Sequence, residues 1–130
     1  MKNKMDLEFA KNQAERIVSL LKPGCQKIKI AGSIRRKKSL VGDIEIVLIP
    51  KIEKRSSLSG LRQFLNYPTS DDVNLLEERL KLIKTQENFH LGKDGPKYKE
   101  LIYLNFKVDL FIADETNFGL IFMIRTGSAE

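Results

Sequence analysis

The sequence predicts an α+β domain in which helices pack on a mixed central sheet. The elements follow the order helix, two strands, further helices and then a run of closely spaced strands. Strands in such a run pair antiparallel, and this grouping is typical of α+β domains rather than of regularly alternating α/β folds. The chain contains no internal repeat.

The composition is that of one globular domain. The chain has 130 residues, of which 42% are hydrophobic and 31% charged, which excludes disordered and low-complexity proteins. No apolar run approaches the about 20 residues of a membrane span, and one cysteine cannot form an internal disulfide. We therefore expect an intracellular, cytoplasmic protein with no membrane partner. Its net charge of +6 favours a polyanionic partner.

The first part of the chain predicts one helix and two strands. Apolar residues recur at three- and four-residue steps from Asp6 to Lys22, and Pro23-Gly24 ends this helix. Ile28 to Ala31 alternates as a short strand, which Gly32-Ser33 breaks. Ile44 to Ile49 has the strongest strand pattern of the chain, with its apolar side chains alternating toward one face.

The middle of the chain predicts a loop and two helices. The polar stretch Lys51 to Ser59 predicts the loop, and leucine spacing after it predicts a short helix that Pro68 closes. A clearer helix runs from Asp71 to Lys84, with Thr69 or Ser70 as its N-cap. We expect this helix and the first one to pack on the sheet.

The last part of the chain predicts three strands and a helix. The strands cover Asn88 to Leu91, Tyr98 to Leu104 and Lys107 to Ala113, and the helix covers Thr116 to Arg125. We expect the strand that ends this series to lie beside the strand Ile44 to Ile49.

A glycine-serine turn precedes a basic segment. Gly32-Ser33 follows a strand, and glycine allows close backbone approach while free amides at a helix start bind anions. Four basic residues follow, namely Arg35, Arg36, Lys37 and Lys38. A plain turn with a solvated basic face is the alternative interpretation.

Three carboxylates stand out in the predicted strands. Asp43 and Glu45, preceded by Gly42, point to one face of their strand, although an ordinary exposed face would give the same alternation. Asp109 lies inside an apolar strand, where a salt bridge to Lys107 would also explain it. If the strands are neighbours, the three acids converge without a neutralising partner, and a pair of Mg²⁺ ions is the usual solution in phosphoryl transfer.

Two stretches resemble a known family. The stretch GSIRRKKSLVGDIEIV resembles the signature of the nucleotidyltransferase superfamily, and its double arginine and the glycine before the first acid are similar to X-family DNA polymerases of the DNA polymerase beta type. The stretch KVDLFIADETNFGLIFMIRTGS resembles the second half of that family's palm. The resemblance implies a palm domain over residues 1–130, without the N-terminal lyase region and the C-terminal helical subdomain.

The resemblance also implies roles for individual residues. Mg²⁺, or Mn²⁺ in its place, would be bound by the three catalytic acids Asp43, Glu45 and Asp109, and Asp109 would help deprotonate the attacking 3′-hydroxyl. Nucleotide-binding residues would be Gly32, Ser33, Arg36, Gly42, Thr126 and Gly127. DNA or phosphate contacts would come from Arg35, Lys37 and Lys38.

The implied function is Mg²⁺-dependent transfer of a deoxynucleotide from a nucleoside triphosphate to a DNA 3′-hydroxyl, in repair or replication. Two alternatives stay open: transfer of a nucleotide to a protein, RNA or small molecule, and a catalytically silent module that binds nucleotide or nucleic acid. We expect the chain alone to bind nucleotide with Mg²⁺ but to extend a primer poorly, because phosphoryl transfer depends on positioning.

Overall fold

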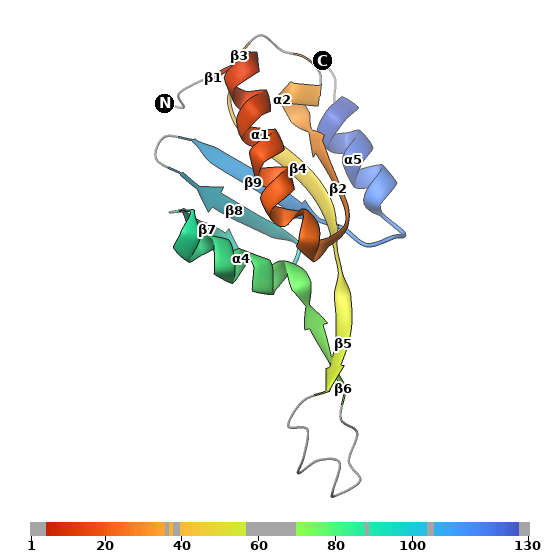
Figure 1. Ribbon diagram of the computed structural model, residues 1–130. Coiled ribbons are helices and arrows are strands. Elements are labelled where there is room, and N and C mark those ends of the chain that lie inside the picture. Colours follow the sequence, from red (N-terminus) through yellow and green to blue (C-terminus); the bar gives the residue numbers. More distant parts are fainter. Residues whose placement is uncertain are drawn as a thin grey trace, which may run out of the picture.

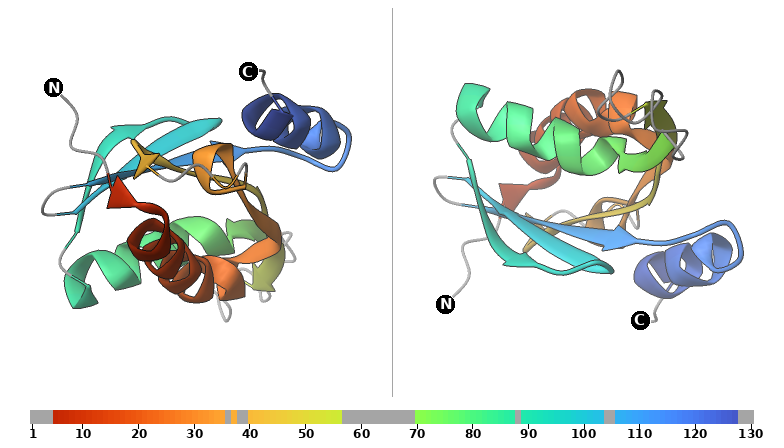
Figure 2. Two further views of the ribbon diagram at one scale, coloured as in Figure 1. Left: turned by 90° about the horizontal axis from the view of Figure 1, so that it is seen from above. Right: turned by 90° about the horizontal axis from the view of Figure 1, so that it is seen from below.

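The computed structural model describes residues 5–35, 37, 40–56, 70–87, 89–103 and 106–127, and all structural statements below concern these residues. Their centre is a five-stranded sheet with helices on both faces (Figures 1 and 2). The strand order is β2 (Cys25–Ala31), β4 (Ile44–Pro50), β9 (Lys107–Ile112), β8 (Tyr98–Ile102) and β7 (His90–Asp94).

The sheet is mixed, as the sequence predicts. Strands β4 and β9 pair in parallel, whereas the other neighbours pair antiparallel. The expected contact between the strand after Asp43 and the strand around Asp109 is therefore confirmed, and it places Glu45 directly opposite Asp109. The two strands are central, so their side chains lie between layers on both faces.

Helices α1 (Leu7–Leu21) and α4 (Leu75–Gln86) cover one face of the sheet (Figure 2). Both expected helices thus pack on the sheet, and both contribute buried apolar stripes to the larger core. The stripe of α1 comprises Ala10, Ala14, Ile17 and Leu21. Asp6 caps α1 by accepting a hydrogen bond from the amide of Phe9 at 2.8 Å. A short 3-10 helix, η1 (Lys22–Gly24), follows α1.

A β-hairpin corrects two predictions in the middle of the chain. Part of the stretch predicted as a loop is strand β5 (Ile52–Ser56), and β6 (Ser70–Asn74) pairs antiparallel with it, projecting from the domain (Figure 1). Helix α4 therefore starts after β6, and its N-cap is Asn74 instead of Thr69 or Ser70. Backbone pairing with β5 outweighs the local helix signal there. The predicted short helix before Pro68 lies outside the described residues.

Helix α5 (Phe118–Gly127) covers the opposite face of the sheet (Figure 2). Phe118 of this helix contributes to a smaller core, whose other buried residues are Ala31, Val47, Ile49 and Ala113. The helix starts two residues later than predicted because Asp114 Oδ1 accepts from the amides of Thr116 and Asn117 and holds them in a turn. Within the described parts of the chain, no helix is long and apolar enough to cross a membrane.

The remaining elements differ from the prediction by a few residues. The predicted strand over 88–91 is shifted to β7, which runs through Gly92. The Glu100 carboxylate lies 2.5 Å from the place that a Cβ on Gly92 would take. Strands β8 and β9 end at Ile102 and Ile112, one or two residues before the predicted ends. The two-residue strands β1 (Met5–Asp6) and β3 (Leu40–Val41) pair with each other, and α2 (Gly32–Arg35) follows β2.

Candidate functional site

A row of three carboxylates crosses the sheet on the face that carries α5. Asp109 of β9 has Glu45 of β4 directly opposite on one side and Glu100 of β8 directly opposite on the other. We call Glu45, Asp109 and Glu100 the acidic row. Their side chains are 17%, 11% and 14% exposed, respectively. Like charges directly opposite destabilise a sheet, so each carboxylate needs a partner.

Two cations partly compensate the acidic row, so two of the three predicted acids, Glu45 and Asp109, have a neutralising partner that we did not expect them to have. Lys107 Nζ lies 3.3 Å from both Asp109 Oδ1 and Glu100 Oε2. Arg125 Nε donates to Glu45 Oε1 at 3.0 Å. The salt bridge between Lys107 and Asp109, which the sequence left open as an alternative, is therefore present.

Asp43 belongs to the same electrostatic cluster. It precedes β4 and is partly buried. Burial works to lower the pKa of the Lys107 ammonium. Neighbouring carboxylates outweigh burial and raise that pKa above its usual value, with Asp109 contributing most among them and Asp43 least. Asp43 is thus close enough to act on Lys107, and the acids predicted from the sequence lie in one region of the sheet.

The acids suit a divalent metal ion by chemistry and by backbone placement, since carboxylate oxygens are the ligands that Mg²⁺ prefers. The parallel register sets Glu45 and Asp109 side by side. Their side chains, however, are paired with cations, and the described residues contain no group of three potential ligands that could hold one ion together. A metal ion at this site would therefore compete with Arg125 and Lys107.

The Gly32-Ser33 turn packs directly against the acidic row. Gly32 has φ +65°, and a Cβ on it would lie 2.6 Å from Glu45 Oε2. Only glycine brings the backbone this close at low conformational cost. Ser33 follows it in α2, which packs against β4 and α5. Gly42 differs, because a Cβ there would meet nothing within 4 Å.

The C-terminal turn of α5 completes this region. Arg125 and Gly32 both approach the Glu45 carboxylate, so the end of α5 that carries Thr126 and Gly127 lies near α2 (Figure 1). The basic segment is described only in part. Lys37 is exposed with φ 58°, whereas Arg36, Lys38 and the side chain of Arg35 lie outside the described residues.

Two residues of the site were not predicted from the sequence. Glu100 lies in the acidic row, and Tyr98 donates its hydroxyl to Asp109 Oδ1 at 2.6 Å. Glu100 also accepts from the amide of Lys93, which lowers the pKa of its carboxyl more than any other contact. Alternation along β8 puts Tyr98 and Glu100 on one face, and this is the signal that could have identified them once β8 is placed beside β9.

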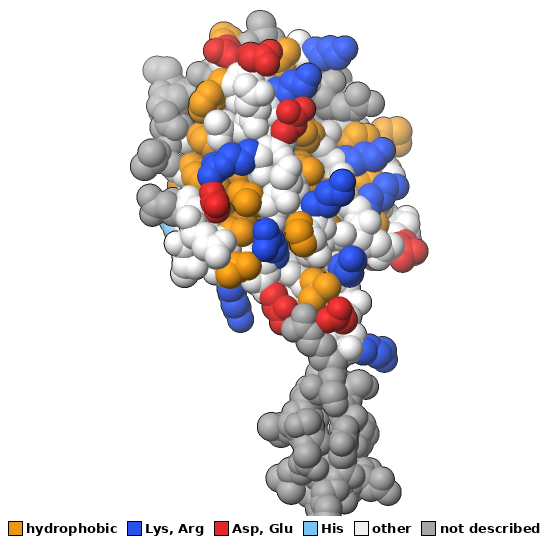
Figure 3. All heavy atoms as spheres, in the orientation of Figure 1, with side chains coloured by type: hydrophobic (Ala, Val, Ile, Leu, Met, Phe, Trp, Pro, Cys, Tyr) orange, Lys and Arg blue, Asp and Glu red, His pale blue; other side chains and the backbone are white. Residues whose placement is uncertain are grey.

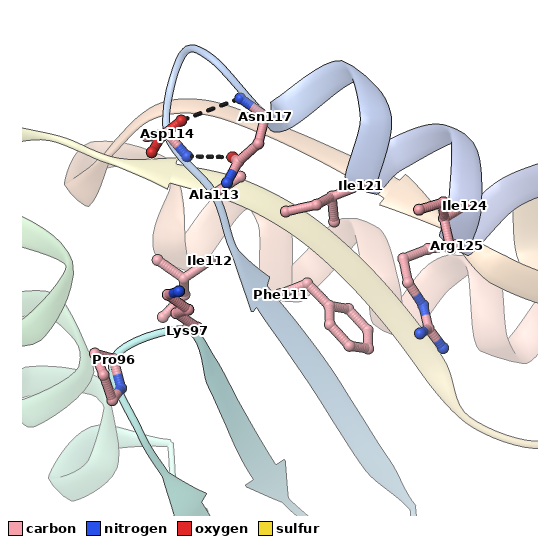
Figure 4. Close-up of a pocket in the computed structure, with 10 residues that line it drawn as sticks. All are labelled: Pro96, Lys97, Phe111, Ile112, Ala113, Asp114, Asn117, Ile121, Ile124 and Arg125. Carbon is pink, nitrogen blue, oxygen red and sulfur yellow. Dashed lines mark hydrogen bonds between the residues drawn. The ribbon is translucent and has the colours of Figure 1, made fainter.

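A pocket of about 490 Å³ lies next to the acidic row, between α5, the end of β9 and the turn before β8 (Figure 4). Its lining is mostly apolar, and Lys97 and Arg125 are its basic members. The Arg125 guanidinium lies 4.3 Å from the centre of the Phe111 ring. Arg125 therefore lines the pocket and also pairs with Glu45 of the acidic row.

Basic side chains also border α5 on the opposite side. Lys27 and Lys29 of β2 lie over the rings of Phe118 and Phe122, at 4.6 and 5.6 Å from the ring centres. In Figure 3, Lys and Arg side chains alternate with hydrophobic ones over β2 and α5, at the right of the view. This surface provides positive charge close to the candidate site.

Two solved structures of Leishmania infantum polymerase beta are similar to this fold. The ternary gap complex has a TM-score of 0.68 at 13% sequence identity, covering 97% of this chain and 43% of that one. The ternary P/T complex has a TM-score of 0.64 at 16% identity, covering 97% of this chain and 49% of that one. No model of a known protein family and no curated protein matches the sequence. This chain thus spans less than half of either polymerase, and what it shares with them is a mixed α+β fold.

Proposed function

We propose that this chain is the nucleotidyl-transferring palm domain of an X-family DNA polymerase, which joins a deoxynucleotide to a DNA 3′-hydroxyl. One observation carries the proposal: parallel strands set Glu45 beside Asp109, and the Gly32 turn packs onto the Glu45 carboxylate. The similarity to two ternary complexes of a polymerase beta supports DNA as the acceptor.

The acids would serve as metal ligands. Once Arg125 and Lys107 give up their ion pairs, Asp43, Glu45 and Asp109 would hold Mg²⁺ or Mn²⁺. The bound ion would neutralise phosphate charge and lower the barrier to in-line displacement. The chain supplies the oxygens, and it also supplies Arg125 and Lys107, which partly compensate these acids before a metal ion binds. The site therefore keeps an excess of negative charge that a divalent ion could compensate.

The turn and the helix end would bind the nucleoside triphosphate. Backbone amides around Gly32 and Ser33 suit phosphate oxygens, and the open space beside Gly42 allows a ligand to approach the backbone. Triphosphate contacts would come from Gly32, Ser33, Arg36 and Gly42, and sugar contacts from Thr126 and Gly127. Arg35, Lys37 and Lys38 would bind phosphates of DNA, with an affinity that falls with salt.

The reaction would be an in-line displacement at the α-phosphate. The acceptor 3′-oxygen forms a bond to the α-phosphorus, the bond to the β-phosphate oxygen breaks, and pyrophosphate leaves. Asp109 would receive the proton of the 3′-hydroxyl on a carboxylate oxygen. Because this step depends on alignment, the contribution of this domain is to hold the reacting groups in place.

A silent binding module is the second candidate function. The pairing of Glu45 with Arg125 and of Asp109 with Lys107 favours it, because those carboxylates are already compensated within the chain. The two functions differ in chemistry. A silent module binds nucleotide or DNA without forming pyrophosphate.

Primer extension tests the proposal directly. The chain is incubated with a labelled primer on a template, dNTPs and Mg²⁺ or Mn²⁺, and primer length and pyrophosphate are measured. We expect slow but metal-dependent extension. Nucleotide binding without pyrophosphate release would support the silent module, and labelling of protein, RNA or a small molecule in place of the primer would identify a different acceptor.

A further inference from the structure

The Asp109 carboxylate accepts a hydrogen bond from an uncharged donor, the Tyr98 hydroxyl, in addition to its ion pair with Lys107. Register places Tyr98 of β8 opposite Phe111 and diagonal to Asp109, on the face that carries the acidic row. Tyr98 Oη lies 2.6 Å from Asp109 Oδ1 and 3.0 Å from Glu100 Oε2. The hydroxyl therefore stands between two carboxylates of neighbouring strands.

The hydroxyl has only one proton to give. A tyrosine hydroxyl is protonated at neutral pH and donates one hydrogen bond, whereas ionised carboxylates only accept. The shorter distance assigns this proton to Asp109. The hydroxyl thus fixes Asp109 while adding no charge to the site, which distinguishes it from the Lys107 ammonium.

The Tyr98 ring is held in place by its neighbours. It packs on the Phe111 ring with 5.3 Å between the ring centres, and Arg125 lies over that same Phe111 ring. Aromatic cross-strand pairs of this kind restrict side-chain movement. The donor therefore has a defined position relative to Asp109.

Tyr98 and Lys107 both contact the same oxygen of the Asp109 carboxylate. Tyr98 Oη and Lys107 Nζ approach Oδ1, at 2.6 and 3.3 Å. Among the described residues, no hydrogen bond or ion pair engages Oδ2. Oδ1 is thus anchored by Tyr98 and Lys107, whereas Oδ2 has no partner among the described residues.

We infer that Tyr98 is a positioning residue for Asp109: its hydroxyl anchors Oδ1 and directs Oδ2 toward the acceptor hydroxyl or a metal ion. The inference rests on the proposed function for the identity of that group. A metal ion competes electrostatically with Lys107, but it does not repel a neutral hydroxyl. Tyr98 can therefore keep its contact when the cations are displaced, and Asp109 stays oriented during the reaction.

The substitution Tyr98→Phe removes the hydroxyl and keeps the ring on Phe111. Tyr103→Phe is the matched control, because it removes a tyrosine hydroxyl that packs against the larger core instead of the acidic row. Three quantities are compared with the wild type: Mn²⁺ affinity without nucleotide, kcat and KM for the dNTP, and the rotamer of Asp109 from NMR couplings of its β protons. The melting temperature is measured alongside.

We expect Tyr98→Phe to fold normally and to leave KM for the dNTP unchanged. Its Mn²⁺ affinity or its kcat should fall about tenfold, because the removal of a group that orients a metal ligand has an effect of this size. Its Asp109 side chain should average between rotamers, whereas the wild type and Tyr103→Phe keep one. If Tyr98→Phe behaves like Tyr103→Phe in all three quantities, the inference is wrong. If the wild type transfers no nucleotide, the proposed function fails, and the Asp109 rotamer still decides the role of Tyr98.

Discussion

Arg125 and Glu45, 80 residues apart in sequence, form an ion pair with Nε 3.0 Å from Oε1 at the edge of the candidate site. The pair joins the last turn of α5 to the start of β4, and the guanidinium also lies over the Phe111 ring. The ion pair with Glu45 and the stacking of the planar guanidinium on Phe111 together give the Arg125 side chain a defined orientation. Arg125 therefore occupies the position that a cation bound to Glu45 would need.

Removal of the Arg125 charge should strengthen metal binding. In Arg125→Met the Glu45 carboxylate loses its partner, and a divalent cation no longer competes with a guanidinium. A partly exposed ion pair is worth at most about 1 kcal/mol, so we expect a two- to fivefold rise in Mn²⁺ affinity by calorimetry, roughly what that energy corresponds to. Arg16→Met is the control, because Arg16 pairs with Glu87 away from the acidic row. An equal rise in both variants would indicate a general charge effect and contradict the prediction.

The contact between Gly32 and Glu45 should not tolerate a methyl group. In Gly32→Ala the new Cβ would lie 2.6 Å from Glu45 Oε2, at a positive φ that alanine adopts at a cost of about 1–2 kcal/mol. We expect urea denaturation to show a loss of at least that size. Gly119→Ala is the matched control, because a Cβ there meets nothing within 4 Å inside α5, and alanine favours a helix. If both variants are equally stable, the close packing of Gly32 is not what requires glycine.

Periodic patterns predicted the parts of the fold that local sequence determines. The stripe of α1 and the alternation of β4 appear at the expected residues, and β4 lies beside β9 as expected. That the two strands pair in parallel was not predicted. The hairpin β5–β6 was not predicted, because its polar residues gain strand structure by pairing with each other. Pairing between distant segments leaves no periodic signal in either one.

The candidate site was predicted as a set of acids but not as a network. Spacing within single strands indicated Asp43, Glu45 and Asp109. The partners Tyr98 and Glu100 enter the site through the register of β8 against β9, which a single strand does not reveal. The compensation of Glu45 by Arg125 likewise depends on how α5 crosses the sheet.

The buried Lys99 ammonium should make stability depend on alkaline pH. Lys99 is 3% exposed and pairs with Asp94 and Glu77, joining β7 and α4 to β8. Burial works to lower the pKa of this ammonium, but the two carboxylates outweigh it and raise the pKa above the usual 10.5. A raised pKa in the folded state contributes stability below the unfolded-state pKa, and this stability is lost as pH rises through the folded-state value.

We therefore expect the wild type to lose free energy of unfolding above about pH 10, the ordinary lysine range, more steeply than Lys99→Met. Chemical denaturation between pH 7 and 11 measures the difference. Lys81→Met, which removes an exposed lysine of α4, is the control and should follow the wild type. Parallel pH curves for Lys99→Met and the wild type would contradict this role of Lys99.

Asp109 is the residue whose loss should stop catalysis without unfolding the protein. In Asp109→Asn the amide oxygen still accepts from Tyr98, while the negative charge between Glu45 and Glu100 disappears. The repulsion that is relieved offsets the lost Lys107 pair, so we expect the free energy of unfolding to change by less than about 1 kcal/mol. Primer extension should fall below detection, and Mn²⁺ affinity should fall with it. Asp72→Asn, an exposed acid of the hairpin, is the matched control and should keep both activities. Normal extension by a stably folded Asp109→Asn would show that Asp109 neither binds the metal ion nor receives the proton of the 3′-hydroxyl.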